Sequence, residues 1–239
     1  MKRITFMVFR LILFVPYWFV RLMIYAYTNA GTEESRYRLI KRILTKANKA
    51  GRVTVVSSGV ENLPKEMGYM IYPNHQGLYD TLAFFETDPH PFVPVMKREV
   101  TNTFMLKQVR MILRGVTIDR DDVKSAMRTI HAIAEEVKQG RNYLIFSEGT
   151  RSRKGNQTLD FKGGSFKAAY YAKCPIVPVA LVDCYKAFDT NSIAPVTIQI
   201  HYLPPIPYEE YKDKKTMEVA SMVRGMIDAK IAEVTGGAA

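Results

Sequence analysis

Apolar residues dominate the start of the chain. From Ile4 to Tyr27 the sequence is almost entirely aliphatic or aromatic, apart from two arginines and Pro16. The uninterrupted apolar run, residues 11–20, would be about 15 Å long as a helix, which is roughly half the hydrocarbon thickness of a bilayer. We therefore expect a helix that lies on or dips into a membrane, kinked or broken near Pro16, rather than a simple spanning helix.

Basic residues gather on one side of this helix and of a second one. On a helical wheel Arg3, Arg10 and Arg21 fall within a narrow arc, so we expect them to lie at lipid headgroups. A second helix is predicted from Glu33 to Ala50, with Gly51 just past its end. It has an apolar stripe on one side and a basic opposite side that we expect to face anionic lipid. The stripe is Leu39, Ile40, Ile43, Leu44 and Ala47, and the basic side is Arg36, Arg38, Lys41 and Arg42.

After Gly51 short β-rich runs alternate with helical stretches. This alternation predicts an α/β fold with a mixed, largely parallel sheet flanked by helices. We divide the chain into an N-terminal helical membrane-associating segment, residues 1–50, and an α/β domain, residues 51–239. The predicted strands are 52–57, 69–72, 92–96, 116–118, 143–146, 176–181 and 196–203, and the predicted helices include 121–139, 166–172 and 217–234.

Positive charge is concentrated in the N-terminal segment. The 239-residue chain has a formal charge of +11, and residues 1–50 hold ten lysines and arginines against two acids. These charges lie among membrane-like residues and no nucleic-acid motif is present, so we expect membrane lipids as partners and not nucleic acid. A cleaved signal peptide is disfavoured, because a charge follows the apolar run and the nearest small-residue site, near Ala30, lies far downstream. A buried core helix is the other alternative.

Motifs for common metals and cofactors are missing from the sequence. Cys174 and Cys184 have no metal-ligand spacing, so we expect no metal site. No Gly-rich nucleotide-binding motif and no GxSxG nucleophile motif occurs. We interpret His90, His131 and His201 as structural residues.

Polar clusters follow several predicted strands, where ligands gather in α/β folds. The first cluster is NHQGLYD, residues 74–80. His75 and Asp80 would lie about 140° apart on one continuous helix, so only a turn at Gly77 followed by a helix can bring the two side chains together. In that geometry Asp80 orients the imidazole and leaves its other nitrogen free to accept a proton. The alternative is a His75 that only caps or packs.

The second cluster is FSEGTRSRKG, residues 146–155. Backbone amides around Gly149 and Thr150, with the guanidinium of Arg151, are expected to bind a phosphate, because arginine offers a planar fork of donors. Glu148 could accept a substrate hydroxyl or hold a cation in place. The alternative is a polar surface turn with a charge pair.

Two further cations lie near the ends of predicted strands. Arg120, in the third cluster GVTIDRDD (residues 115–122), could add a second fork to the same phosphate, or only cap and pair locally. Lys97 is in a comparable position, and its alternative is an exposed lysine at a strand end.

Together NHQGLYD, GVTIDR, FSEGTRS and PIVPVAL (residues 175–181), in this order and at these separations, resemble the four sequence blocks of the 1-acylglycerol-3-phosphate acyltransferase family. The resemblance spans roughly Val53 to Pro205, and the chain has the size of bacterial members with their N-terminal membrane-associating helices. Two positions depart from the family pattern, since many relatives have Ser where Gly77 stands and Pro where Ser147 stands. Neither departure removes a chemical group from the mechanism.

The resemblance implies transfer of a fatty acyl group from an acyl thioester, on acyl carrier protein or coenzyme A, to the sn-2 hydroxyl of lysophosphatidic acid. It implies that His75 is the general base, that Asp80 supports it, and that Arg120 and residues 148–151 hold the glycerol phosphate. It implies no cofactor besides the thioester co-substrate, and a location at the cytoplasmic face of the inner membrane. Another lysophospholipid or glycerol 3-phosphate as acceptor, and a non-catalytic anionic-lipid-binding protein, are the alternatives.

Overall fold

The computed structural model of the protein describes residues 2–28, 30–97, 104–119 and 122–237. Within these residues six strands form one sheet in the order β1-β8-β7-β2-β6-β3, and β4 pairs with β5 in a second sheet. Neighbouring strands are parallel except for β7 and β8, which confirms the predicted mixed, largely parallel sheet. Each predicted strand range overlaps an observed strand. The strands are β1 (Val53–Ser58), β2 (Met70–Pro73), β3 (Val93–Pro94), β4 (Met96–Lys97), β5 (Thr117–Ile118), β6 (Tyr143–Leu144), β7 (Ile176–Val182) and β8 (Val196–Tyr202).

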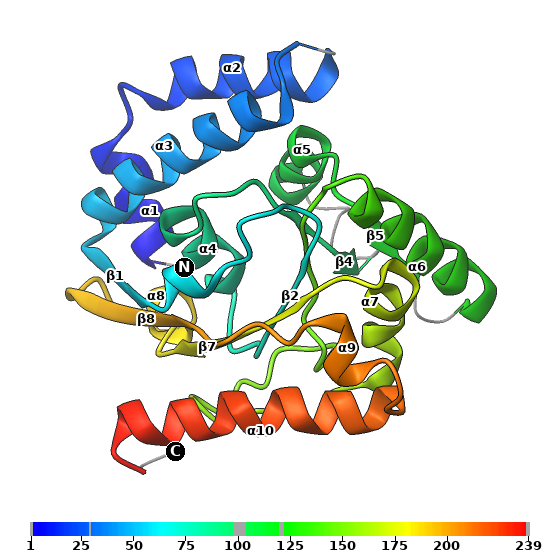
Figure 1. The fold of residues 1–239 in the computed structure, drawn as a ribbon. Coiled ribbons are helices and arrows are strands. Elements are labelled where there is room, and N and C mark those ends of the chain that lie inside the picture. Colours follow the sequence, from blue (N-terminus) through cyan, green and yellow to red (C-terminus); the bar gives the residue numbers. More distant parts are fainter. Residues whose placement is uncertain (1, 29, 98–103, 120–121, 238–239) are drawn as a thin grey trace.

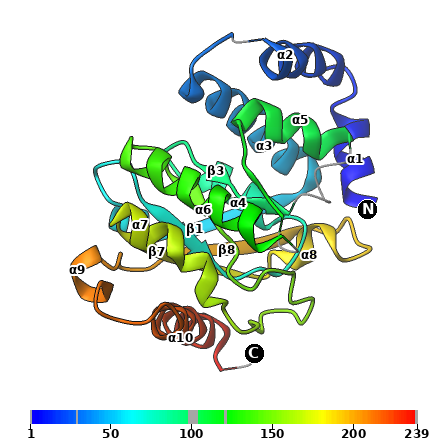
Figure 2. The same cartoon turned by 90° about the vertical axis from the view of Figure 1, so that its right-hand side faces the viewer.

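Helices cover both faces of the larger sheet. Figures 1 and 2 show α10 on one face and α3 and α4 on the other. The helices are α1 (Lys2–Arg10), α2 (Val15–Tyr27), α3 (Glu33–Gly51), α4 (Asp80–Thr87), α5 (Phe104–Leu113), α6 (Val123–Lys138), α7 (Lys167–Ala172), α8 (Tyr185–Phe188), α9 (Tyr208–Tyr211) and α10 (Thr216–Thr235), with short 3-10 helices at Val60–Asn62 and Gly163–Phe166.

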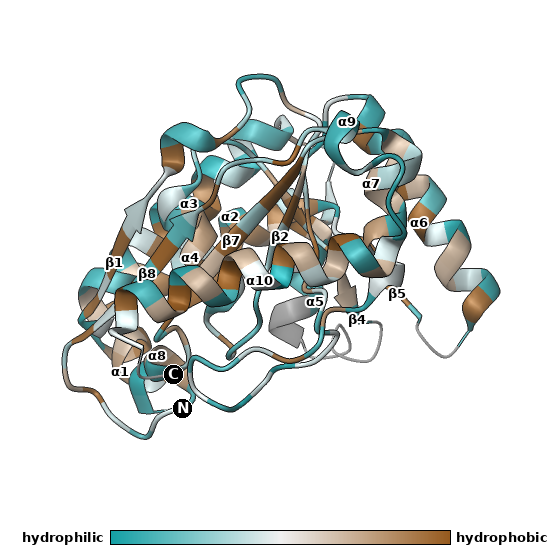
Figure 3. Cartoon of the chain, turned by 60° about the horizontal axis from the view of Figure 1, so that its bottom comes forward, coloured by the Kyte–Doolittle hydropathy of each residue, from teal (hydrophilic) through white to brown (hydrophobic). Residues whose placement is uncertain are grey.

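Two apolar layers hold the sheet between these helices. Side chains alternate along β2, so that Met70 and Tyr72 join the layer under α10 while Ile71 joins the layer under α3 and α4. Both faces are therefore buried, and the central strands are almost wholly apolar, as Figure 3 shows for β2 and β7 behind α10. This is why short apolar runs identified the strands in the sequence.

The N-terminal apolar segment forms two helices instead of one. Residues 11–14 separate α1 from α2, whose axes are bent by 102°, and Pro16 lies in the first turn of α2. Proline suits that position because its missing N–H would have no helical partner there. The predicted break near Pro16 is confirmed. Among the described residues, no helix by itself has both the length and the apolar composition to cross a bilayer, although the bent pair α1 and α2 meets those criteria when taken together.

The expectation that Arg3 lies at lipid headgroups is wrong. Its side chain is 1% exposed, and the guanidinium donates hydrogen bonds to the carbonyls of Gly51 (2.6 Å), Ala187 (2.8 Å) and Ala194 (2.8 Å). Those carbonyls belong to the end of α3, to α8 and to the segment before β8. A helical wheel drawn for a single straight helix could not reveal this, because α1 turns away from α2 and packs on α3 and α8.

Two expectations about α3 are also corrected. Arg36 does not face lipid, because it is buried and donates to the carbonyl of Gly31 at 2.7 Å. Gly51 is the last residue of α3 and not the residue past its end, where Arg52 adopts the left-handed conformation. Gly51 packs closely on α1, since a Cβ there would lie 2.0 Å from Cε and 2.8 Å from Cγ of Met7, so the methionine side chain would have to move. The division at residues 50 and 51 into two units stays a prediction.

Hydrogen bonds also join α3 to α4. The buried amide of Asn48 accepts a hydrogen bond from the Tyr79 hydroxyl at 2.7 Å and donates to Glu86 at 3.0 Å. The Tyr37 hydroxyl donates to the carbonyl of Asp88 at 3.1 Å, just past the end of α4. Helix α3 thus holds α4 at both ends, and α4 begins at Asp80.

Replacement of Arg3 by methionine should destabilise the fold by about 2–4 kcal/mol, because three buried carbonyls lose a charged donor. The measurement is chemical unfolding in detergent. Lys2→Met is the matched control, because Lys2 is exposed and its loss removes the same charge. Equal destabilisation by the two substitutions would contradict the role given to Arg3.

Candidate active site

The sheet topology brings the first two polar clusters together. In the parallel pairing of β2 with β6, Met70 lies opposite Tyr143 and Ile71 opposite Leu144, and the amide of Ile145 donates to the carbonyl of Ile71 at 2.9 Å. The carboxyl ends of the two strands therefore meet at one edge of the sheet. Residues 74–80 follow β2 there and residues 146–152 follow β6.

His75 and Asp80 form a hydrogen-bonded pair in the loop-then-helix arrangement that the sequence required. His75 Nδ1 lies 2.7 Å from Asp80 Oδ2, and Asp80 is the first residue of α4. The same carboxylate oxygen accepts the amides of Gln76 (2.5 Å) and Gly77 (2.9 Å). Burial raises the pKa of Asp80, and these hydrogen bonds act against that rise. A carboxylate acceptor at Nδ1 favours the tautomer in which Nδ1 carries the proton and Nε2 is a base.

The ring of Phe146 fixes the plane of the imidazole. The two rings are stacked with their centroids 3.9 Å apart and their planes 19° apart. The side chain of His75 is 21% exposed, and no hydrogen bond to its Nε2 is found among the described residues. The imidazole thus has one nitrogen hydrogen-bonded to Asp80, while the other has no hydrogen-bond partner among the described residues.

Glu148 holds the backbone of His75. Its two carboxylate oxygens accept the amides of His75 (2.7 Å) and Leu159 (3.0 Å). The carbonyl of His75 accepts a hydrogen bond from the amide of Ser152 at 2.7 Å, so the second cluster binds both the N–H and the carbonyl of His75. Glu148 is 2% exposed, and burial raises its pKa to about 7. A contact between Glu148 and substrate stays a prediction.

Side-chain amides fix the rest of the loop after β2. Asn74 makes a pair of hydrogen bonds with the backbone of Leu181 on β7, at 3.0 and 2.7 Å. Gln76 donates to Leu181 and Asn156 and accepts the amide of Cys184, each at 2.9 Å. Both side chains are 1% exposed, and their amide oxygen and nitrogen atoms hydrogen-bond to neighbouring segments, which fixes the loop.

Arg151 points toward the same loop. Its Nη1 lies 3.3 Å from Asp189 Oδ1, and the other oxygen of Asp189 accepts the amide of Leu78 at 2.8 Å. Thr150 is exposed. The amide of Gly149 donates to the carbonyl of Phe146 at 3.1 Å and closes a turn, so this amide is already used within the loop. Phosphate binding by these residues stays a prediction.

Of the two remaining predicted cations, the structure describes only Lys97. Lys97 is exposed at the carboxyl end of β4, where it pairs in register with Ile118 of β5. Arg120 lies outside the described residues. Among those that are described, no three His, Cys, Asp or Glu side chains are grouped so that they could hold a metal ion.

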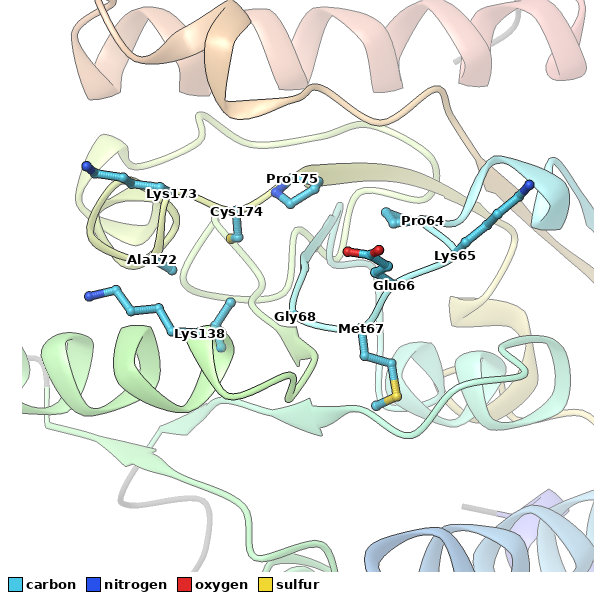
Figure 4. Close-up of a pocket in the computed structure, with 11 residues that line it drawn as sticks. Pro64, Lys65, Glu66, Met67, Gly68, Lys138, Ala172, Lys173, Cys174 and Pro175 are labelled. Carbon is cyan, nitrogen blue, oxygen red and sulfur yellow. The ribbon is translucent and has the colours of Figure 1, made fainter.

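A hollow of about 510 Å³ lies away from these residues. It is lined by residues 64–68, Val137, Lys138 and residues 172–175, and the side chains of Lys65 and Lys173 extend from its opposite sides (Figure 4). Its walls precede β2 and β7, whereas His75 follows β2. The hollow is therefore at the amino ends of these strands, opposite the His75 edge.

Several residues of the site were missed by sequence reasoning. Asn74, Gln76 and Phe146 lie inside the recognised clusters, and their place directly beside His75 or after a strand was an available signal. Asn156 and Asp189 had no local signal, because they reach the site only through the packing of distant segments.

Comparisons with known proteins show the family to which the chain belongs. The Acyltransferase family model matches residues 53–182. The 1-acyl-sn-glycerol-3-phosphate acyltransferase of Salmonella typhimurium is 32% identical over 169 residues, 70% of this chain and 69% of that protein. The enzyme of the same name from Borreliella burgdorferi is 29% identical over 181 residues, 75% of this chain and 72% of that protein. The chain therefore belongs to the Acyltransferase family.

A solved structure shares the fold. The crystal structure of the 1-acyl-sn-glycerophosphate (LPA) acyltransferase PlsC from Thermotoga maritima superposes with a TM-score of 0.78 and 20% sequence identity. The match covers 98% of this chain and 95% of that chain, so it includes the N-terminal helices as well as the sheet.

The raised pKa of Glu148 makes a testable contribution to stability. The folded protein keeps this proton up to about pH 7, whereas the usual pKa of the group is 4.5. Its ionisation therefore favours the unfolded chain, and stability falls as pH rises through this window. We expect the free energy of unfolding of wild type, relative to Glu148→Gln, to decrease from pH 4.5 to about 7 and then level off. A difference that is constant or increases with pH, in unfolding titrations, would contradict this.

Proposed function

We propose that the protein transfers a fatty acyl group from an acyl thioester, on acyl carrier protein or coenzyme A, to the sn-2 hydroxyl of lysophosphatidic acid, forming phosphatidic acid. The observation that carries this proposal is the 2.7 Å hydrogen bond between His75 and Asp80, in a fold whose relatives are named for this reaction. Those names support lysophosphatidic acid as acceptor over other lysophospholipids or glycerol 3-phosphate.

In this mechanism His75 is the general base. Its Nε2 takes the proton from the acceptor hydroxyl while the oxygen attacks the thioester carbonyl. The carbon–oxygen bond forms, the carbon–sulfur bond breaks, and the imidazolium returns its proton to the leaving thiolate. Asp80 stabilises the imidazolium and fixes its orientation through the hydrogen bond at Nδ1. Every proton moved in this sequence comes from the substrate, so we propose that no cofactor is needed.

Arg151 is the first proposed phosphate ligand, and it directly precedes Ser152, whose amide donates to the carbonyl of His75. Arg151 lies in the same loop as Glu148. Only one nitrogen of its guanidinium faces Asp189, so other N–H groups can bind a phosphate. We assign Gly149, Thr150, Lys97 and Arg120 to the same phosphate, with Glu148 holding the loop that carries Gly149, Thr150 and Arg151. Two cationic forks favour a phosphomonoester over a phosphodiester.

The first two helices are the proposed membrane-binding surface. Ten large apolar side chains between residues 8 and 27 are at least 41% exposed. Such a patch far exceeds the scattered apolar residues of an ordinary surface. We propose that it inserts into the membrane, at the cytoplasmic face where the thioester donors occur, so that the lipid acceptor reaches His75 laterally. The ten are Val8, Phe9, Ile12, Leu13, Phe14, Tyr17, Phe19, Val20, Ile24 and Tyr27.

Acyl transfer from a labelled thioester to lysophosphatidic acid tests the catalytic proposal. We expect His75→Ala to lower the rate by on the order of a hundredfold or more, because a positioned base is lost. Arg151→Ala should chiefly raise the KM for the acceptor. His131→Ala is the control, since His131 stacks on Tyr171 away from the site. Full activity of His75→Ala, or no product from wild type with any lysophospholipid, would favour the lipid-binding alternative.

Vesicle pelleting tests the membrane proposal. Phe9 is 76% and Leu13 is 89% exposed, so replacing both with serine should weaken binding to anionic vesicles by at least about tenfold while the fold is kept. Val123→Ser is the control, because Val123 is 73% exposed on α6. An equal loss of binding in the control, or none in the double variant, would refute this surface.

A further inference from the structure

Asp189 connects the segments that follow three neighbouring strands. It comes directly after α8, which follows β7. Its Oδ1 lies 3.3 Å from Nη1 of Arg151 in the loop after β6, and its Oδ2 accepts the amide of Leu78 in the loop after β2. No sequence block of the family resemblance includes this residue. One carboxylate therefore fixes the proposed phosphate ligand relative to the loop of the proposed base.

The Asp189 carboxylate occupies the space that a side chain at residue 77 would need. A Cβ at Gly77 would lie 2.3 Å from Asp189 Oδ2 and 3.0 Å from the Cα of Tyr185. The first contact is far inside the van der Waals limit, so Asp189 cannot keep this position beside a larger residue. A glycine at 77, where many relatives have serine, is what admits the carboxylate.

The backbone that carries Asp189 is itself held in place. The Asp189 amide donates to the carbonyl of Tyr185 at 2.9 Å, and Arg3 donates to the carbonyl of Ala187 at 2.8 Å. Helix α8 is thus attached to the buried arginine of α1. The Asp189 and Arg151 side chains are 28% and 27% exposed, so the pair is partly accessible to solvent although the backbone of Asp189 is held in place.

We propose that Asp189 is a positioning residue that orients Arg151 toward the phosphate of the acceptor, and that Gly77 is required for it to do so. The inference rests on the proposed phosphate-binding role of Arg151. A single hydrogen bond to Asp189 limits the rotation of the guanidinium and leaves its other N–H groups for the substrate. Asp189 acts on acceptor affinity and does not touch the reacting atoms.

Steady-state kinetics of Asp189→Asn tests this role. Asparagine keeps an oxygen for the Leu78 amide but loses the charge that holds Arg151. We expect the KM for lysophosphatidic acid to rise about threefold to tenfold, while kcat and the KM for the thioester change by less than about twofold. Glu209→Gln is the control, because Glu209 is an exposed acid paired with Lys212 on α9 and its replacement makes the same charge change.

The outcomes separate this inference from the proposed function. If wild type does not acylate lysophosphatidic acid, or Arg151→Ala leaves the acceptor KM unchanged, the proposed function or its phosphate site fails. If Arg151→Ala raises that KM but Asp189→Asn does not, or lowers it, only the role of Asp189 is overturned. A parallel fall of kcat and rise of both KM values would mean a structural role alone.

A double-mutant cycle tests whether the role of Asp189 depends on Gly77. Gly77→Ala should raise the acceptor KM strongly in wild type and much less in the Asp189→Ala background, since the closest contact is then gone. Strictly additive effects on KM would overturn the steric link between the two residues. Thermal unfolding of each variant shows whether the fold is retained.

Discussion

The hydrogen bond between His75 Nδ1 and Asp80 Oδ2 is the interaction on which the site depends. Asp80 is fully buried, which raises its pKa, and His75 and the amides of Gln76 and Gly77 act against that rise by donating to one of its oxygens. Those donors meet the carboxylate only when the turn closes and α4 begins at Asp80. The His75–Asp80 pair and the local backbone therefore form, or are lost, together.

The rest of the molecule holds this turn from several sides. Asn74 attaches it to β7, Glu148 attaches it to the loop after β6, and Asn48 on α3 binds the hydroxyl of Tyr79 next to Asp80. The last contact gives the N-terminal helices a second role. The same segment that exposes an apolar surface on α1 and α2 also positions the helix that carries Asp80, so the proposed membrane attachment would be connected to the geometry of the site.

Much of this structure could be predicted from local patterns in the sequence. The strands were identifiable because both faces of the sheet are covered. The His75–Asp80 pair was a candidate because, at five positions apart, the two side chains can meet only if a turn at Gly77 is followed by a helix. Contacts between distant segments could not be predicted from the sequence. Arg3 is 184 positions from Ala187, and its burial depends on how α1 packs on α8. Asp189 reaches Leu78 and Arg151 through the order of strands, which no spacing rule encodes.

The most direct test of the account is the protonation of the His75 ring. In nitrogen-15 NMR of histidine-labelled protein, with the resonances assigned by comparison with His75→Gln, the neutral imidazole should carry its proton on Nδ1 and leave Nε2 unprotonated. Asp80→Asn should remove this preference, because an asparagine is a weaker acceptor than a carboxylate. A neutral ring protonated at Nε2 in wild type would contradict the assignment of Nε2 as the base, and with it the mechanism.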